Sequence, residues 1–101
     1  MKNLILKGNE KFEEFLVKRT EKCRYREIGV QYVYKFENNY GASIIKHEWS
    51  YGFEKDLWEL AVIKFYRDKF DLVYDTEITD DVIGYLRDEE VIELLEKIKE
   101  L

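Results

Sequence analysis

The sequence predicts a single α+β domain spanning residues 1–101, in which helices pack on an antiparallel meander sheet of four or five strands. Several segments alternate between apolar and polar residues with the period of two that is typical of strands. Both ends of the chain instead repeat apolar residues at helical spacing. Hydrophobic residues make up 46% of the chain, which is enough for one core, and the length leaves no room for a second.

The first element expected is a helix over residues 9–19. Asn9 suits the N-cap position and acidic residues follow it in the first turns, as the helix dipole favours. Phe12, Phe15 and Leu16 then recur at helical spacing, so we expect this stripe in the core.

A strand is expected over residues 30–37, because large apolar side chains occupy every second position. The Asn38-Asn39 pair that follows is typical of a two-residue hairpin turn. Such a turn would place Tyr34 opposite Ser43 and Phe36 opposite Gly41. The predicted core face of this strand consists of Val30, Tyr32, Tyr34 and Phe36.

A second hairpin is expected over residues 57–78, with its turn at Asp68-Lys69. This turn would pair Phe65 with Leu72 and Ile63 with Tyr74. The predicted core face holds Ala61, Ile63, Phe65, Phe70, Leu72 and Tyr74. The opposite face holds Trp58, Leu60, Val62 and Val73. This second face is too apolar to stay in water, so helices or a partner must cover it.

Two helices are expected at the C-terminal end. Thr79 or Asp80 would cap a short helix over residues 81–86, and Asp88 would cap a longer helix reaching Leu101. The longer helix carries an apolar stripe and acidic residues in its first turn, as a helix packed on a sheet should.

The charge is unevenly distributed along the chain. The net charge is −5; residues 1–70 carry 14 Lys and Arg against 11 Asp and Glu, whereas residues 71–101 carry 3 against 11. The acidic end would attract a partner with a basic surface. The alternative explanation is a solvated helix face together with acidic N-terminal caps.

The sequence also predicts a cytoplasmic protein without cofactors. Cys23 is the single cysteine, which excludes an internal disulfide and a multi-cysteine metal site. No apolar run approaches the ~20 residues that span a bilayer, and the first ten residues do not have the pattern of a signal peptide.

Two groups of side chains are candidates for partner binding. Trp49, Tyr51 and Phe53 cluster in one loop, where they either fold back over the core or form an interaction patch. The second group is an acidic corner, Asp75, Glu77, Asp80 and Asp81. Helix capping is the simpler explanation of that corner, because it lacks the glycine of an EF-hand loop, and we expect no metal there.

Catalysis is not expected. His47 is the single histidine, and no phosphate-binding glycine loop, nucleophile elbow or zinc-protease motif occurs.

Two alternative roles remain open. Nucleic-acid binding would use Lys22, Arg24, Tyr25 and Arg26, although the acidic net charge argues against it. A structural homodimer would use the apolar face formed by Leu60, Val62 and Val73.

Three segments carry a resemblance to a known group of proteins. The patterns Y-x-F-x-N-x-Y-G-A-S at 34–43, E-L-A-V at 59–62 and Y-D-T-x-I-T-D-D-V-I-G-x-L at 74–86 resemble small uncharacterised proteins of phages and prophages. The resemblance covers residues 30–101, but Asn38-Asn39 stands where the group tends to have Asn-Gly. It implies a mobile-element setting and not an activity. Small acidic phage proteins often act by stoichiometric binding, so our first hypothesis is an accessory protein that binds a host protein, including anti-CRISPR and other anti-defence inhibitors.

Overall fold

The computed structural model describes residues 3–24, 27–79 and 81–101, and these form an α+β fold with one antiparallel sheet. The elements within the described ranges are η1 (Asn9–Phe15), β1 (Leu16–Arg24), β2 (Glu27–Lys35), β3 (Tyr40–His47), η2 (Phe53–Lys55), β4 (Trp58–Tyr66), β5 (Lys69–Leu72), β6 (Ile83–Leu86) and α1 (Asp88–Lys99). Both η elements are short 3-10 helices. The predicted α+β class with an antiparallel sheet is confirmed.

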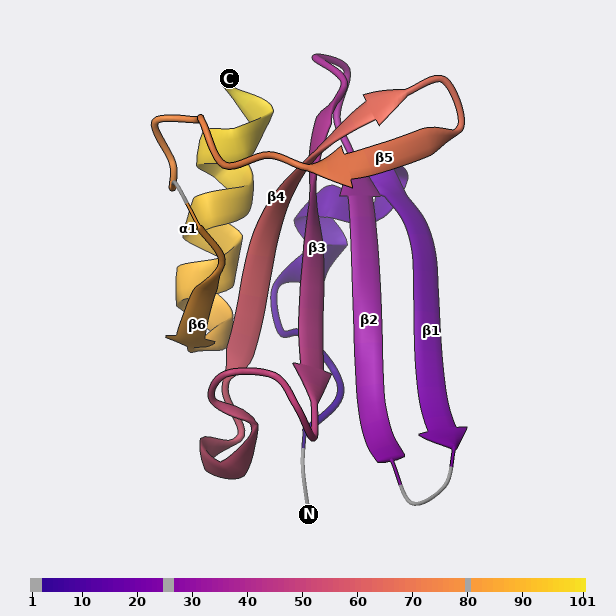
Figure 1. The fold of residues 1–101 in the computed structure, drawn as a ribbon, viewed down its shortest axis with the longest axis vertical. Coiled ribbons are helices and arrows are strands. Elements are labelled where there is room, and N and C mark those ends of the chain that lie inside the picture. Colours follow the sequence, from indigo (N-terminus) through magenta and orange to yellow (C-terminus); the bar gives the residue numbers. More distant parts are fainter. Residues whose placement is uncertain (1–2, 25–26, 80) are drawn as a thin grey trace.

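The sheet follows the order β1-β2-β3-β4-β5, and β6 also pairs with β4 (Figure 1). β5 pairs only with residues 63–66, the second half of β4. The first half of that edge would otherwise leave main-chain groups unpaired, and β6 fills it, with Leu86 opposite Trp58 and Ile83 opposite Leu60. The predicted short helix over 81–86 is therefore wrong, and the described sheet has six strands instead of four or five.

The N-terminal helix is shorter than predicted. η1 ends at Phe15, and Leu16 already has extended backbone angles, φ −73° and ψ 114°. From Leu16 to Arg24 the chain pairs with β2, whose edge would be open if the helix continued to residue 19. Strand pairing thus overrides local helical spacing. Phe12 is buried as expected, and Phe15 and Leu16 pack against the same core.

The β2–β3 hairpin turns over three residues, not two. Phe36 N–H donates to the Tyr40 carbonyl at 2.8 Å, and Asn39 adopts φ 69°. A three-residue loop ending in a left-handed residue is a common hairpin form. The predicted pairs are therefore shifted by one residue, and Tyr34 lies opposite Ala42.

The β4–β5 hairpin turns one residue earlier than predicted, at Arg67-Asp68, whose first residue has φ 63°. Phe65 pairs with Phe70, and Ile63 pairs with Leu72. These partners lie two residues before the predicted ones. Because side chains alternate with a period of two, the shift leaves them on the same face of the ribbon.

The main core lies between the sheet and the helices η1 and α1, on what we call the helix-covered face (Figure 1). Tyr32 and Tyr34 of β2 are stacked with centroids 6.3 Å apart, and Trp58 meets Tyr32 edge-on at 5.8 Å. The buried members of this core are Leu6, Phe12, Val30, Tyr32, Tyr34, Phe36, Ala42, Ile44, Trp58, Leu60, Val62, Leu86, Val91, Leu95 and Ile98.

The face of β4 that meets the helices is the one predicted to lie opposite the core. Trp58, Leu60 and Val62 are buried in the main core and Val73 packs against it, so helices cover this face. The proposed dimer surface is therefore inside the molecule. Ile63 and Phe65, on the predicted core face, are buried in a smaller cluster on the other side of the sheet. Both faces of β4 are apolar, so alternation alone does not indicate which face meets the helices.

The other side of the sheet, the open face, has a small second cluster. Val33, Ile63 and Phe65 are buried there, where the twisted β4–β5 ribbon crosses the ends of β2 and β3 (Figure 1). Phe70 and Leu72 of β5 lie on the same face but are 40% and 47% exposed. The predicted core face is thus only partly covered.

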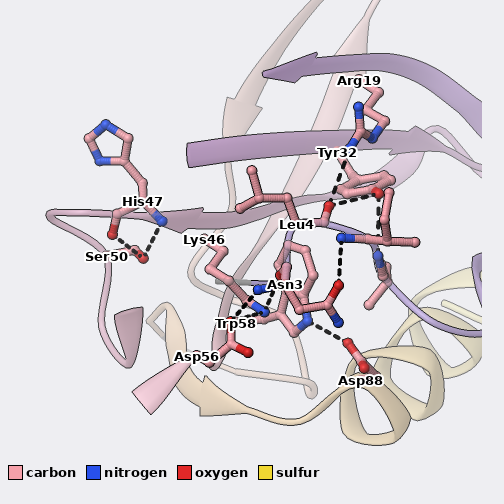
Figure 2. Close-up of polar contacts among 12 residues, drawn as sticks. Asn3, Leu4, Arg19, Tyr32, Lys46, His47, Ser50, Asp56, Trp58 and Asp88 are labelled. Atoms are coloured by element: carbon pink, nitrogen blue, oxygen red, sulfur yellow. Dashed lines mark hydrogen bonds and ion pairs between the residues drawn. The ribbon is translucent and has the colours of Figure 1, made fainter. Parts of the chain in front are cut away.

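A buried cation joins three parts of the chain beneath the sheet. Lys46 is 1% exposed, and its Nζ donates to the Asn3 carbonyl at 2.6 Å and to Asp56 Oδ1 at 2.9 Å (Figure 2). The same Nζ lies 4.2 Å from the centre of a Trp58 ring, and Trp58 Nε1 donates to Asp88 at 2.6 Å. This network fixes the N-terminal arm, the loop before β4 and the start of α1 relative to one another.

Candidate protein-binding surface

The connection from β3 to β4 opens with a tight turn over residues 47–50. Ser50 Oγ donates to the His47 carbonyl at 2.8 Å and accepts from His47 N–H at 2.9 Å (Figure 2). The imidazole Nδ1 of His47 accepts from Trp49 N–H at 3.3 Å. These bonds hold the backbone of Trp49, whose side chain is 79% exposed.

The second half of this loop is anchored at its base. Gly52 adopts φ 98°, and its carbonyl accepts from Leu57 N–H at 2.9 Å. Asp56 adopts φ 61°, and its carboxylate accepts from Lys46 Nζ and from Asn3 N–H, both at 2.9 Å. The loop is therefore fixed to the buried network beneath the sheet.

Tyr51 packs directly on β6. Its N–H donates to Glu59 Oε1 at 2.9 Å, and its carbonyl accepts from Tyr85 N–H at 3.3 Å. Gly84 permits this approach, because a Cβ at that position would lie 2.4 Å from the Cβ of Tyr51. A residue with a side chain at position 84 would push the loop away from β6.

Tyr85 has a strained backbone, with φ 58°. Bulky residues rarely adopt this left-handed conformation, which costs of order 1–3 kcal/mol. The β4–β6 register shifts at the same level, between Trp58 and Leu60. The strain accompanies an exposed ring: Tyr85 is 51% exposed, beside Tyr51 at 60%. We call Trp49, Tyr51 and Tyr85 the aromatic patch.

The surroundings of the aromatic patch are acidic. Residues 47–59 contain four carboxylates and one lysine. Glu48 and Glu54 are exposed, and Glu59 is half-buried under Tyr51. Lys55 Nζ lies 5.9 Å from the centre of the Tyr85 ring. A ligand for this surface must therefore tolerate or complement negative charge.

The predicted binding residues fall into two separate regions. Trp49 and Tyr51 belong to the aromatic patch, whereas Phe53 is half-buried in η2. Asp75, Glu77 and Asp81 lie on the β5–β6 connection, and Asp80 lies outside the described residues. Figure 1 shows this connection near the C-terminal end of α1, while the β3–β4 loop lies at the other end of the molecule. The structure does not bring the two groups together.

The acidic corner is a turn held by threonines, not a helix cap. Thr76 Oγ1 accepts from Ile78 N–H at 3.3 Å and from Thr79 N–H at 3.4 Å. Thr79 Oγ1 accepts from Asp81 N–H at 3.0 Å and donates to the Asp81 carbonyl at 2.5 Å. The corner leads into β6, so the prediction that Thr79 caps a helix is wrong.

This connection forms a shallow groove of about 480 Å³ with the last turns of α1. Its lining residues are Glu77, Ile78, Glu93, Glu96, Lys97, Glu100 and Leu101. Four glutamates and one lysine line it, so the groove is acidic.

The geometry around His47 does not resemble a catalytic pair. The Ser50 hydroxyl is bonded to the main chain of His47 and not to its imidazole, so the serine has no general base in this contact. Neither His47 nor Asp75 lines the groove at the last turns of α1, or the two grooves that Lys11 forms with α1. Within the described ranges, no cluster of three or more His, Cys, Asp or Glu side chains could hold a metal.

Only the first part of the basic stretch lies within the described residues, at the end of β1. Lys22 and Arg24 belong to β1, and Tyr25 and Arg26 lie outside the described residues. The nucleic-acid hypothesis thus stays a prediction from the sequence.

Sequence reasoning missed Tyr85. Its position was assigned to a helix, in which Gly84-Tyr85 has no special meaning. An isolated glycine next to an aromatic residue also suggests a strand bulge with a close backbone approach, and that signal fits the structure.

No protein-family model, curated protein or solved structure matches this chain significantly. Among the described residues, no helix is both long and apolar enough to cross a membrane.

Proposed function

We propose that this protein acts by stoichiometric binding to another protein through the aromatic patch. The single observation that supports this proposal most is the exposure of three large aromatic side chains on a fixed backbone. Trp49, Tyr51 and Tyr85 are 79%, 60% and 51% exposed. Tryptophan and tyrosine dominate the energetics of protein interfaces when a partner covers them.

The loop is ordered before binding, which favours a binding role. Ordering a flexible loop at an interface reduces affinity, and the hydrogen bonds at Ser50, Gly52 and Asp56 lower that cost because they order the loop beforehand. Strained residues cluster at functional sites in proteins, so the left-handed Tyr85 supports the same surface.

The expected partner has a basic surface. The carboxylates around the aromatic patch favour Lys and Arg on the partner and would speed association at low salt. The resemblance to phage and prophage proteins suggests a host protein in the bacterial cytoplasm, such as a component of a defence system. On this proposal the protein is an inhibitor or accessory factor and not an enzyme.

The test is affinity capture from a bacterial host lysate, followed by reconstitution. Wild-type protein is compared with the Trp49→Ala/Tyr51→Ala variant and with a control, Tyr66→Ala/Tyr74→Ala, which removes two exposed tyrosines elsewhere. We expect one protein to be captured by wild type and control but not by the patch variant. The purified pair should then form a complex of fixed stoichiometry in native mass spectrometry. Equal capture by the patch variant would contradict the proposal.

The acidic corner is tested separately. Reversing Glu77, Asp80 and Asp81 to Lys leaves the aromatic patch intact. If only this variant fails to capture the partner, the binding surface is the groove beside α1 and not the aromatic patch.

Direct nucleic-acid binding is the alternative function. A gel shift at low salt, in which wild type retards DNA or RNA and a variant lacking Lys22, Arg24 and Arg26 does not, would favour it.

A further inference from the structure

β5 lies at one edge of the sheet. It pairs with β4 on one side, no other described strand pairs with its outer side, and all four of its residues are exposed. Phe70 and Leu72 are 40% and 47% exposed on the open face. Natural proteins usually protect such an edge, because it offers unpaired main-chain groups to another strand.

The main chain of β5 determines which groups are free. In an antiparallel pair every second residue directs its N–H and C=O toward the partner strand. Val73 N–H donates to the Val62 carbonyl at 2.9 Å, so Asp71 and Lys69 also face β4. Phe70 and Leu72 therefore direct their N–H and C=O groups outward, away from β4.

A second β5 could pair antiparallel with this edge in only a few symmetric registers. Phe70 opposite Leu72 of the second copy would bring the two Asp71 carboxylates face to face, which is unfavourable. Leu72 opposite Leu72 would place each Asp71 carboxylate opposite Val73 of the second copy, where it has no charge to pair with. Phe70 opposite Phe70 instead places Lys69 opposite Asp71 of the second copy, and the symmetry repeats this ion pair.

The same register extends the aromatic contacts across the edge. Phe65 and Phe70 already lie with centroids 5.3 Å apart within one chain. Two copies would form a row of four phenylalanines on the open face, with the charged pairs on the other side of the ribbon. In this register the phenylalanines of the two copies meet on one side of the ribbon, and Lys69 and Asp71 of the two copies pair on the other side. The edge of β5 is therefore complementary to a second copy of itself.

We propose that this protein forms a twofold-symmetric dimer by antiparallel pairing of β5 with β5, with Phe70 opposite Phe70. This interface differs from the buried Leu60 and Val62 face and does not depend on the partner proposed above.

The first test is a charge swap followed by sedimentation velocity. Wild type should rise in mass from 12.3 kDa toward twice that value as its concentration increases. Lys69→Glu alone and Asp71→Lys alone each place like charges opposite one another, so each should weaken dimerisation about tenfold or more. An equimolar mixture of the two variants restores both ion pairs and should dimerise as wild type does.

The second test determines the register by cross-linking in a Cys23→Ser background. Lys69→Cys mixed with Asp71→Cys should form a disulfide-linked heterodimer under mild oxidation. Lys69→Cys alone should not cross-link with itself, because the two copies of residue 69 are not opposite each other. Circular dichroism confirms that each variant is folded.

A wild-type mass of 12.3 kDa at every concentration up to the solubility limit would overturn the proposal. So would single charge variants that dimerise as strongly as wild type, or equal cross-linking by Lys69→Cys alone.

Discussion

Lys46 is a charged side chain that the fold accommodates almost fully out of water, at 1% exposure. Its ammonium group has a carboxylate, a carbonyl and an indole ring as partners. Asp56 is 41% exposed at its side chain, so water can solvate this carboxylate if the lysine is removed. The loss of stability on replacing Lys46 should therefore come mainly from lost packing and from the Asn3 carbonyl, which would be left unpaired.

We expect Lys46→Ala to lower the free energy of unfolding by about 2–4 kcal/mol, because it removes a buried side chain together with its hydrogen bonds. Lys46→Met keeps most of the side-chain volume, so its free energy of unfolding should fall by less. Urea denaturation measures both variants. Equal losses would show that the charge, and not the packing, supplies the stability.

Tyr34 provides a test of pH dependence. The side chain is fully buried, and within the described chain its hydroxyl has no hydrogen-bond partner of standard geometry. Burial raises the pKa of Tyr34 from 10.0 to about 12, and the nearby Asn9 side chain offsets only part of this rise. The folded protein thus keeps the phenol protonated where the unfolded chain ionises, so stability is complete below pH 10 and falls as the pH rises toward 12.

Tyr34→Phe should therefore reduce the loss of stability between about pH 10 and 12, and it should not destabilise the protein at pH 7, since it removes an unpaired hydroxyl. Thermal unfolding across this pH range measures the effect. Tyr74→Phe, at a half-exposed position, is the control and should retain the wild-type profile.

Tyr85 tests whether backbone strain accompanies the aromatic patch. Tyr85→Gly and Tyr85→Ala both remove the ring, but only glycine adopts φ 58° without strain. We expect the Gly variant to be more stable than the Ala variant by about 1 kcal/mol, the reverse of the order in an ordinary strand. Chemical denaturation measures the difference in stability between the two variants. A more stable Ala variant would mean that the backbone at position 85 is not strained in solution.

At the scale of elements, α1 is fixed to the sheet at its first residue. Trp58 Nε1 donates to Asp88 Oδ1 at 2.6 Å, and Trp58 is 1% exposed. Glu90 accepts from Arg87 N–H at 3.0 Å, and this main-chain bond, with the Arg87 side chain, lowers the pKa of Glu90. The start of the helix is thus determined by tertiary contacts as well as by its own sequence.

Asp88→Ala leaves the buried indole N–H unpaired and should lower the free energy of unfolding by about 1–3 kcal/mol. Asp88→Asn keeps an acceptor and should retain most of the stability. Guanidinium denaturation, followed by circular dichroism, compares the two variants. An equal loss for both would assign the effect to the charge of Asp88 near the helix N-terminus.

At the scale of the whole molecule, stability should decrease from the centre of the sheet outward. β2, β3 and β4 contribute most of the fully buried side chains and are paired on both edges. β5 has four exposed residues, and no described strand pairs with its outer edge. Local opening follows such differences in burial and pairing.

Hydrogen exchange should therefore be slowest at the paired amides of β2, β3 and β4. In dilute protein the outward-facing amides of Phe70 and Leu72 should exchange fastest among the sheet residues. Nuclear magnetic resonance measures these rates residue by residue. Slow exchange at Phe70 at low concentration would show that the β5 edge is covered within the single chain.

The sequence by itself determined the fold class, the core face of β2 and the helical stripe of the last element. These depend on patterns within one segment, such as the alternation from Val30 to Phe36. It also identified Trp49 and Tyr51 as unusual loop residues and located the acidic end of the chain.

The tertiary structure decided those features for which the local sequence is compatible with more than one structure. Both faces of β4 are apolar, so only packing against α1 determined that Leu60 and Val62 are inside. Residues 16–24 and 83–86 form strands because they pair with main-chain groups of β2 and β4 that would otherwise be unpaired. The aromatic patch formed only when the fold brought Tyr85 to Tyr51, since contacts between distant segments leave no periodic signal in either one.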